Sequence, residues 1–381
     1  MTKPVNTEST NTQAISAESR NIEQQQLKVI REKIDELDIQ IQTLINERAR
    51  CAQQIATIKI QGGENGNFYR AEREAQILRN IESRNTGPLS NKDVARLFRE
   101  IMSACLALER PLKIAFLGPA GTYNHVATIK HFGGSIDEAP VRNIEEIFRT
   151  VESDQAHFGV VPIENSTEGV IAHTLDLLTH SSLLICGEVE LRIQHNFISN
   201  EKNMHDIKKV FSHQQSLAQC RRWLDVNCPG ITQYAVSSNA EAVRLIKSEP
   251  GTAAIAGRLA AEIYQLPILA ANIEDEPENT TRFIVIGKNA VAPSGKDRTS
   301  LLVTASNKPG ALQRLLKPLA DRSISMSKIE SRPSRRGVWE YVFFIDIDGH
   351  QDDILVAEAL KAIELESSMI RILGSYPRAV L

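Results

Sequence analysis

The chain has 381 residues, of which 42% are hydrophobic and 24% charged, and its formal net charge is −3. This length predicts two or three domains, and the lack of a basic surplus argues against a protein that neutralises nucleic-acid phosphates. The five cysteines form no CxxC pair and have no histidine at ligand spacing, which indicates reduced thiols rather than a disulfide frame or a metal site. No apolar run reaches membrane-spanning length, so a membrane is not an expected partner.

The first 21 residues are rich in Ser, Thr and Asn and lack the apolar segment of a signal peptide. They predict a disordered tail on a cytoplasmic protein. In residues 22–61 apolar side chains recur at alternating spacings of three and four, and no Pro or Gly interrupts them. Such a helix spans ~60 Å, too long to bury its own apolar stripe inside a small monomer.

Residues 22–110 as a whole are predicted to form an all-helical domain. The glycine-rich stretch GGENGN, residues 62–67, ends the long helix. A second helix is expected from about Ala71 to Arg84, and a third from Val94 to Leu108, after the break at TGPLSNKD.

Three cations of the long helix are candidates for anion binding. Arg48 and Lys59 are eleven residues apart, so they lie on the same face and could reach towards one anion held between them. Arg31 points about 100° away and would serve a different site, such as the equivalent site of a partner chain. A solvated, salt-bridged helix face is the alternative interpretation.

The stretches IREKIDELDIQIQTLINERARCAQQIATIK, YRAERE and ARLFREIMSACLALE resemble the all-helical chorismate mutase family over the whole region. The resemblance implies an intertwined helical dimer that rearranges chorismate to prephenate. It also implies roles for the matching residues: Arg31 reaches into the partner's site, Arg48 and Arg73 hold substrate carboxylates, Lys59 and Glu109 flank the ether oxygen, Glu74 takes the ring hydroxyl, and Cys105 stands where many relatives place a small hydroxyl residue.

A Claisen rearrangement needs no nucleophile and no metal, but it folds a dianion and develops negative charge on an ether oxygen. Preorganised cations and hydrogen-bond donors lower that barrier. A carboxylate at Glu109 would repel the ether oxygen, so Glu109 is expected to act only when protonated. We therefore predict a mutase rate that falls as pH rises, and a flatter profile for Glu109→Gln.

From Pro111 onwards, strand-like stretches alternate with helical segments, which predicts an α/β architecture with a mostly parallel sheet. The predicted strands are KIAFLG (113–118), HFGVVPI (157–163), SLLICGEVEL (182–191), VFSH (210–213), AAIAG (253–257) and RFIVIG (282–287). The turn GPAGTY lacks both the GxGxxG spacing and a GK[ST] ending, which argues against a nucleotide enzyme and leaves no cofactor expected.

Polar turns follow several of these strands. In open α/β folds the strand ends converge on a ligand, so the turns together predict one site. Taken alone, NTTRF would be a strand start fringed by an arginine, and a hydroxyl in the ENST turn would be a helix cap. The turn residues concerned are Gly121 and Thr122, then Glu164, Asn165, Ser166 and Thr167, then Gln215, and finally Thr281 and Arg282.

In this order, GPAGTY, VVPIENSTEG, SHQQSLAQC and TTRF closely resemble the prephenate dehydratase family over residues 112–288. The resemblance implies two α/β lobes around a cleft, like a periplasmic binding protein, and a reaction that converts prephenate to phenylpyruvate, CO₂ and water. TTRF is the family's catalytic signature, with Thr281 as the key hydroxyl and Arg282 beside it. Because Thr281 is too weak an acid to give up its own proton, we expect it to donate to the departing hydroxyl, with a proton relayed from Glu164 or water.

The remaining residues of this region are expected to bind the substrate or to support the site. Asn165, Gln215 and the amides near Gly121 and Thr122 are predicted to hold the carboxylates. Ser166, Thr167 and Phe283 complete the predicted substrate contacts. In contrast to these, four residues are expected to be tolerated replacements or structural side chains: Asn124, Asn239, His195 and His213.

Residues 289–298 form a predicted linker, and residues 299–378 follow a βαββαβ order, typical of a ferredoxin-like module. ASNKPGALQRLLKPLA and SKIESRP resemble an ACT domain of the phenylalanine-binding kind. The resemblance implies a phenylalanine site at the interface of two modules, although ordinary turns and strand ends would also explain both motifs. The implied contacts are Gly310, Ala311, Leu312, Glu330, Ser331, Arg332 and Pro333.

Together the three resemblances are those of a bifunctional chorismate mutase/prephenate dehydratase, with chorismate and prephenate as substrates and inhibited by L-phenylalanine. A homodimer or homotetramer is expected. A two-lobed ligand sensor is the rival, and it would bind prephenate but never turn it over, with or without Thr281→Ala. A dehydratase with an inactive mutase is the third possibility, suggested by Cys105 and Arg70. Loss of mutase but not dehydratase activity in Arg31→Ala would exclude it.

Overall fold

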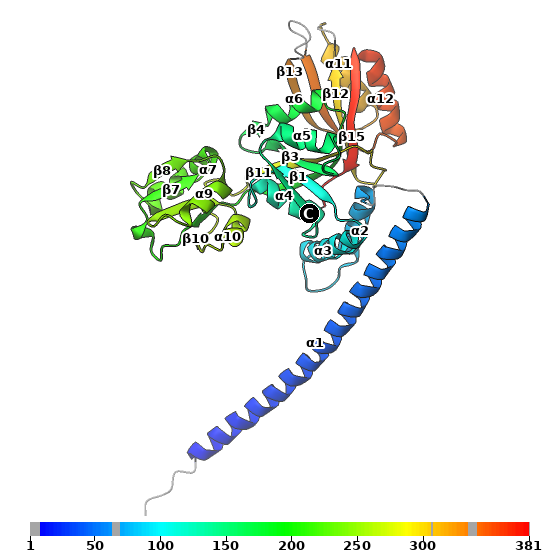
Figure 1. The fold of residues 1–381 in the computed structure, drawn as a ribbon. Coiled ribbons are helices and arrows are strands. Elements are labelled where there is room, and N and C mark those ends of the chain that lie inside the picture. Colours follow the sequence, from blue (N-terminus) through cyan, green and yellow to red (C-terminus); the bar gives the residue numbers. More distant parts are fainter. Residues whose placement is uncertain (1–7, 63–68, 306–307, 334–340, 381) are drawn as a thin grey trace, which may run out of the picture. The chain divides into compact units, whose positions relative to one another are not determined.

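A computed structural model describes residues 8–62, 69–305, 308–333 and 341–380 (Figure 1). The chain divides into two units, residues 1–66 and 67–381, and each is described by itself. The start of the predicted tail and most of the GGENGN loop lie outside the described residues. None of the described helices combines the length and apolar character that a membrane span needs.

Helix α1 (Glu8–Gln61) is the described element of the first unit. It starts at Glu8, earlier than the residue 22 expected from the sequence and within the predicted tail. The physical reason is that no Pro or Gly lies between Glu8 and Gln61 to end the helix. Its apolar stripe is exposed by 43 to 63%, at Leu27, Ile30, Ile34, Leu37, Ile41 and Leu44.

Helices α2 (Ala71–Arg84) and α3 (Asn91–Glu109) confirm the two helices predicted after the loop. Leu78 of α2 packs against Ala95 and Met102 of α3. Both helices belong to the second unit, where Arg99 donates to the carbonyl oxygen of Lys130 at 2.7 Å. The predicted helical region is therefore split between the two units.

The first α/β lobe is built on one sheet with strand order β2-β1-β3-β11-β5, and β4 pairs with β3. Its strands are β1 (Lys113–Leu117), β2 (Asp137–Val141), β3 (Phe158–Asn165), β4 (Gly169–Val170), β5 (Leu184–Arg192) and β11 (Thr280–Gly287). Its helices are α4 (Tyr123–Phe132), α5 (Ile144–Glu152) and α6 (Ala172–His180).

The second lobe lies between β5 and β11 in the chain and has strand order β10-β6-β9-β7-β8. Its strands are β6 (Asn196–Ile198), β7 (Lys209–Ser212), β8 (Thr232–Ala235), β9 (Thr252–Ala256) and β10 (Ile268–Ala270). Its helices are α7 (Gln214–Gln219), α8 (Arg221–Asn227), α9 (Asn239–Ile246) and α10 (Arg258–Tyr264), with a short 3₁₀ helix at Met204–Asp206.

The six predicted strands of this region are confirmed, but the mostly parallel sheet is not. Strand β1 is parallel to β2 and β3, and β7 is parallel to β8 and β9. Strand β11, however, returns from the second lobe and inserts antiparallel between β3 and β5. Strand β6 is likewise antiparallel to β9 and β10. Both sheets are therefore mixed.

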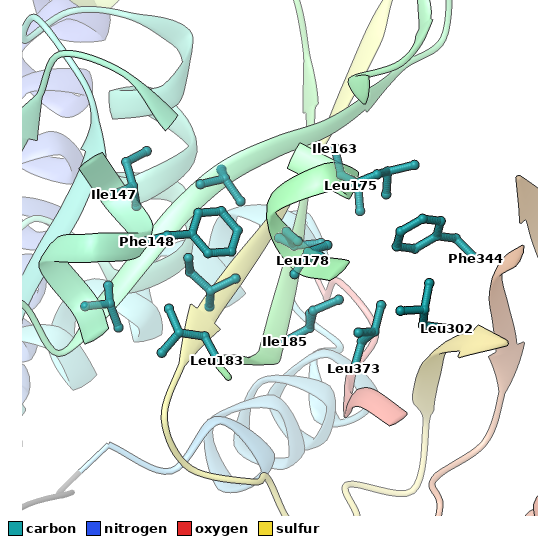
Figure 2. Close-up of a cluster of buried hydrophobic side chains, with 14 of the residues drawn as sticks. Ile147, Phe148, Ile163, Leu175, Leu178, Leu183, Ile185, Leu302, Phe344 and Leu373 are labelled. Carbon is teal, nitrogen blue, oxygen red and sulfur yellow. The ribbon is translucent and has the colours of Figure 1, made fainter. Parts of the chain in front are cut away.

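The C-terminal module has the predicted βαββαβ order and a four-stranded sheet of order β13-β14-β12-β15. Its elements are β12 (Asp297–Thr304), α11 (Ala311–Asp321), β13 (Met326–Pro333), β14 (Tyr341–Asp348), α12 (Ile354–Glu366) and β15 (Met369–Pro377). One face of this sheet is buried against the first lobe. Figure 2 shows Leu302, Phe344 and Leu373 in one hydrophobic cluster with Ile163, Leu175 and Ile185. The module and the lobe thus share a core.

Candidate active site

A cavity of about 960 Å³ lies between the two lobes. The end of β3 and the start of the antiparallel β11 line it from the first lobe, and the starts of α7 and α9 line it from the second. Of the residues predicted to form the site, Thr122, Asn165, Gln215, Thr281 and Phe283 line this cavity. The strand ends therefore converge as the turn pattern predicted.

Asn165 and Thr281 form a direct side-chain pair in the cavity wall. They stand opposite one another across β3 and β11, and Asn165 Nδ2 donates to Thr281 Oγ1 at 2.8 Å. Asn165 Oδ1 accepts from the backbone N–H groups of Thr167 and Glu168, both at 3.0 Å. These two donors fix which end of the amide is the oxygen, because a carbonyl oxygen accepts and an NH₂ group donates.

This orientation determines where the hydroxyl hydrogen of Thr281 can go. Since Asn165 supplies the hydrogen in their shared bond, Thr281 Oγ1 is the acceptor and keeps its own O–H for another partner. Both side chains are almost fully buried, at 7% exposed, yet both line the cavity. Thr281 can therefore donate to a group bound there, which is the arrangement a departing hydroxyl needs.

Two predicted substrate contacts instead hold the turn that carries Asn165. Thr167 Oγ1 donates to Asn165 Oδ1 at 2.6 Å. Ser166 and Thr280 are tied together twice: Ser166 N donates to the Thr280 carbonyl oxygen and Ser166 Oγ accepts from Thr280 N, both at 2.9 Å. Neither Ser166 nor Thr167 lines the cavity, so the structure gives them a supporting place.

Asn279 is a cavity residue that the sequence reasoning missed. Its Oδ1 accepts from Asn165 Nδ2 at 2.8 Å, and its side chain is 2% exposed. The residue stands two positions before Thr281 in NTTRF, so the signal was present in the motif. Alternation along a strand places residues two apart on the same face, which is how Asn279 and Thr281 both reach Asn165.

The structure places Glu164 and Arg282 outside the cavity lining. A strand alternates its side chains, so Arg282 points to the face opposite that of Thr281. Its guanidinium donates to Asp346 and Tyr376 of the C-terminal module, and Lys328 of that module donates to Glu164 Oε2 at 2.9 Å. The structure therefore gives Arg282 and Glu164 contacts to the C-terminal module and none to the cavity, so it adds no support for a proton relay from Glu164.

A β-bulge in β3 keeps the side chain of Asn165 on the same face of the sheet as that of Thr281. Thr281 pairs with Asn165 and Arg282 with Glu164, but Phe283 pairs with Pro162, which leaves Ile163 without a partner residue on β11. Such an extra residue re-aims the side chains that follow it, and bulges recur next to active sites. Without it, the amide of Asn165 would lie on the wrong face of the sheet.

The turn before α4 is closed by its own hydrogen bonds. Gly121 N donates to His125 Nδ1 at 3.1 Å, and Thr122 Oγ1 donates to the Leu117 carbonyl oxygen at 2.8 Å. Gly121 has φ of +91° and a Cβ there would lie 3.0 Å from Ala260 Cα, so this turn needs glycine. The Gly121 amide is therefore engaged within the protein and not available to hold a carboxylate, contrary to the prediction.

His195 lies in a hydrogen-bonded chain along the cavity. Tyr123 Oη is 2.8 Å from His195 Nδ1, and His195 Nε2 is 2.9 Å from Gln219 Oε1. Burial lowers the pKa of His195, although Gln219 and Glu274 act in the opposite direction. A neutral ring that donates from Nε2 to Gln219 accepts at Nδ1, and the single hydroxyl hydrogen of Tyr123 serves either that nitrogen or the Gln194 carbonyl oxygen, which is also 2.8 Å away.

The cavity has little positive charge of its own. Among the described residues that line it, Arg142 is the one Lys or Arg side chain. Asn124 also lines it, and its Nδ2 is a buried donor without a hydrogen-bond partner in the described structure. Asn239 lines the cavity too, and it connects elements of the second lobe, because it accepts from Ser212 and donates to Ser216. His213 lines the cavity from α7.

The residues implied by the mutase resemblance fall into both units. Arg31, Arg48 and Lys59 lie on α1, and the other four lie on α2 and α3, at Arg73, Glu74, Cys105 and Glu109. Arg73 is exposed, whereas Glu74 Oε1 lies 3.3 Å from Arg99 Nε and Cys105 is buried. Burial raises the pKa of Glu74, and Arg99 opposes that shift.

The residues implied by the ACT resemblance lie at two places on the C-terminal module. Gly310, with φ of +75°, precedes α11, and Ala311 and Leu312 form its first turn. Strand β13, which ends with Glu330 to Pro333, is an edge strand of the sheet. Arg332 Nη2 is 3.0 Å from Asp176 Oδ1 of α6.

Comparisons with known proteins agree with these three regions. Family models match chorismate mutase type II at residues 30–110, prephenate dehydratase at 114–291 and the ACT domain at 299–365. A bifunctional chorismate mutase/prephenate dehydratase of Pseudomonas aeruginosa is 52% identical over 94% of this chain and 100% of its own length. The corresponding protein of Neisseria gonorrhoeae is 51% identical over 92% of this chain and 97% of its own.

A solved structure extends the comparison to the fold. The prephenate dehydratase of Arthrobacter aurescens, in complex with L-Phe, is 34% identical, with a TM-score of 0.65. The match covers 70% of this chain and 90% of that one.

Proposed function

This chain belongs to the bifunctional chorismate mutase/prephenate dehydratase family and is an enzyme of both classes, and from that premise we propose how its residues divide the two reactions. The cavity between the α/β lobes carries out the dehydratase reaction. The mutase reaction uses α1, α2 and α3. The two sites share no residue.

The Asn165–Thr281 pair carries the dehydratase proposal. Asn165 and Asn279 hold Thr281 so that its hydroxyl hydrogen points to the leaving hydroxyl of prephenate. The Thr281 O–H stabilises the departing oxygen as the ring becomes aromatic and the carboxylate leaves as CO₂, and solvent supplies the proton that makes water. Arg142 and Gln215 are the side chains we assign to the substrate carboxylates, because a dianion needs a cation and a donor, and Arg142 is the one Lys or Arg side chain among the described residues of the wall, which also carries Glu168 and Glu241.

The mutase proposal requires a second copy of the chain. The exposed stripe on α1 from Leu27 to Leu44 is the surface that this copy would cover, since an uncovered apolar face of this length is unfavourable in water. In a dimer, Arg31 of one copy would complete the site formed by Arg48 and Lys59 of the other.

The ACT module is proposed to bind L-phenylalanine and to inhibit the dehydratase. The L-Phe complex of the Arthrobacter relative supports this assignment. Leu312, Met326 and Ile329 are apolar and 37 to 39% exposed near the expected contacts, which suits an interface between two modules. Gly310 has a positive φ and no side chain, so the start of α11 presents bare backbone at this position.

One assay tests these assignments together. Phenylpyruvate formation is measured from chorismate and, separately, from prephenate, each with and without L-phenylalanine. We expect product from both substrates and less product from prephenate when phenylalanine is present. Product from prephenate alone would refute the mutase proposal, and an unchanged rate with phenylalanine would refute the regulatory one.

A further inference from the structure

Two cross-strand pairs connect the cavity to the C-terminal module. Asn165 stands opposite Thr281, and the next pair along, Glu164 and Arg282, is directly bonded to the same backbone but faces the other way. The two pairs are separated by one peptide unit on each strand. A displacement of the Arg282–Glu164 pair must therefore move the backbone that carries Thr281 and Asn165.

Arg282 is held by three partners at once. Its Nη1 donates to Asp346 at 2.6 Å, its Nη2 to the Tyr376 hydroxyl at 3.0 Å, and its Nε to Glu188 at 2.9 Å. Asp346 lies on β14 and Tyr376 on β15, while Glu188 lies on β5. The planar fork of an arginine suits such a set, and a lysine could satisfy one partner at a time.

The cluster around Arg282 is buried and balanced in charge. Glu188 also accepts from Arg298, and Asp346 also accepts from Ser300 at 2.5 Å. The Arg282 side chain is 11% exposed and that of Glu188 is 1% exposed. Two guanidiniums therefore face two carboxylates, and removing any one of them leaves a buried charge without its partner. Truncating Arg282 would damage the fold as well as any coupling.

Lys328 and Glu164 form the outer end of this cluster. Lys328 Nζ donates to Glu164 at 2.9 Å, and Arg282 Nη1 lies 3.9 Å from the same carboxylate oxygen. Glu164 is 37% exposed at its side chain, so breaking this pair leaves no fully buried charge. Lys328 lies on β13, two residues before Glu330. The strand proposed to touch phenylalanine is thus the strand that holds Glu164.

A second set of contacts holds the helix that follows the Asn165 turn. The Arg371 guanidinium donates to the carbonyl oxygens of Leu178 and Thr179, in the last turn of α6. Arg332 lies 3.0 Å from Asp176 of the same helix. Cations are favourable at a helix C-terminus. The C-terminal module therefore contacts the chain both before Asn165, at Glu164, and after it, at α6.

We propose that Arg282 and Glu164 are positioning residues of the dehydratase, through which the ACT sheet sets the orientation of Thr281 and Asn165. Neither touches substrate, and both act through the strand pair that they share with the catalytic residues. The regulatory part rests on the proposed phenylalanine site: a ligand that shifts β13 moves Lys328 and, with it, Glu164.

Lys328→Met tests this inference, because it removes the outer ion pair and keeps the length of the side chain. Lys317→Met is the matched control, since Lys317 is exposed and its ion-pair partner among the described residues is Asp321, one turn on along α11. Dehydratase kcat and KM, phenylalanine binding by calorimetry and mutase activity are measured for both variants of the full chain. We expect kcat of Lys328→Met to fall about fivefold with KM for prephenate within about twofold.

The regulatory readout separates coupling from a merely structural role. Lys328→Met is expected to bind phenylalanine and to show at most about half of the maximal inhibition of the wild type, while Lys328→Arg restores both values. Adding Glu164→Gln to Lys328→Met should cause little further loss, because the two residues form one pair.

The inference is overturned if kcat and maximal inhibition of Lys328→Met equal those of Lys317→Met while phenylalanine still binds. If phenylalanine fails to bind even the wild type, the proposed phenylalanine site is wrong. The kcat comparison then decides the positioning role by itself.

Discussion

The cavity between the lobes and helix α1 differ in whether a single chain supplies a complete active site. The cavity has its hydroxyl, its orienting amides and its walls from a single chain, and the ACT sheet that backs it is buried in a shared core (Figure 2). Helix α1, in contrast, carries three of the proposed mutase residues, and its apolar stripe is exposed. The comparison predicts that the dehydratase site is complete in one chain and that the mutase site is not.

Thr281→Ala should have the largest effect of the changes considered. Removing one preorganised donor to the leaving group is expected to lower dehydratase kcat about 10²- to 10³-fold, with the mutase rate unchanged. Rates of phenylpyruvate formation from prephenate measure the first value, and chorismate loss measures the second. A variant that binds prephenate and turns it over normally would contradict the role of Thr281, and a wild type without any turnover would favour the sensor.

Leu37→Glu tests the other side of the comparison. A carboxylate in the centre of the α1 stripe cannot be covered without losing its hydration, so the dimer should dissociate and the mutase rate fall at least about tenfold. Ile39→Glu, about 200° around the same helix, is the control. Light scattering gives the mass of each variant. An intact dimer with a full mutase rate in Leu37→Glu would show that the stripe is not the interface.

Asn279→Ala should have a smaller effect, confined to the dehydratase. It removes the acceptor that holds Asn165 Nδ2, and we expect kcat to fall roughly tenfold with KM little changed. Asn279→Asp keeps an acceptor oxygen and should retain more activity than Asn279→Ala. Equal activities of the two variants would mean that this hydrogen bond does not orient Asn165.

Arg142→Gln is expected to weaken substrate binding rather than catalysis. Loss of the cation should raise KM for prephenate several-fold, about 1 to 2 kcal/mol of a charge-assisted contact, and leave kcat within about twofold. Arg149→Gln, on the neighbouring helix α5 and outside the cavity, is the control. An unchanged KM in Arg142→Gln would assign the carboxylates to other residues.

The smallest expected effect is on the pH dependence of folding stability, and it involves neither active site. Burial and Arg99 lower the pKa of His131 to about 3. An unfolded histidine titrates near 6.5, so the unfolded chain binds the extra proton in the window from about 6.5 down to 3, and stability falls as pH falls through it. The unfolding midpoint of His131→Gln should therefore depend less on pH than that of the wild type. Parallel profiles would contradict the neutral ring bonded to Tyr69.

The sequence predicted the order of elements well where local pattern decides it. An uninterrupted apolar period gives α1, and the βαββαβ order gives the C-terminal module. It failed where a strand arrives from far away in the chain: β11 returns antiparallel, and no local pattern contains that information.

The same limit on prediction from sequence applies to individual side chains of the site. Thr281 and Arg282 are neighbours in one motif and were both assigned to the site from the sequence, although the alternation of a strand turns their side chains to opposite faces. The bulge at Ile163, which decides the side on which Glu164 lies, depends on the pairing of β3 with β11 and could not be seen in either strand alone. The partnership of Tyr123 with His195 is equally a product of the fold.

Complementation between inactive variants tests most directly whether each active site is formed by one chain or by two. Arg31→Ala and Arg48→Ala are unfolded and refolded together, so that hybrid dimers contain one site with both arginines. We predict that about one quarter of the wild-type mutase rate returns, because half of the dimers are hybrids and half of their sites are intact. Thr281→Ala mixed with Asn165→Ala should restore no dehydratase activity. Restoration of the dehydratase, or none of the mutase, would contradict the account.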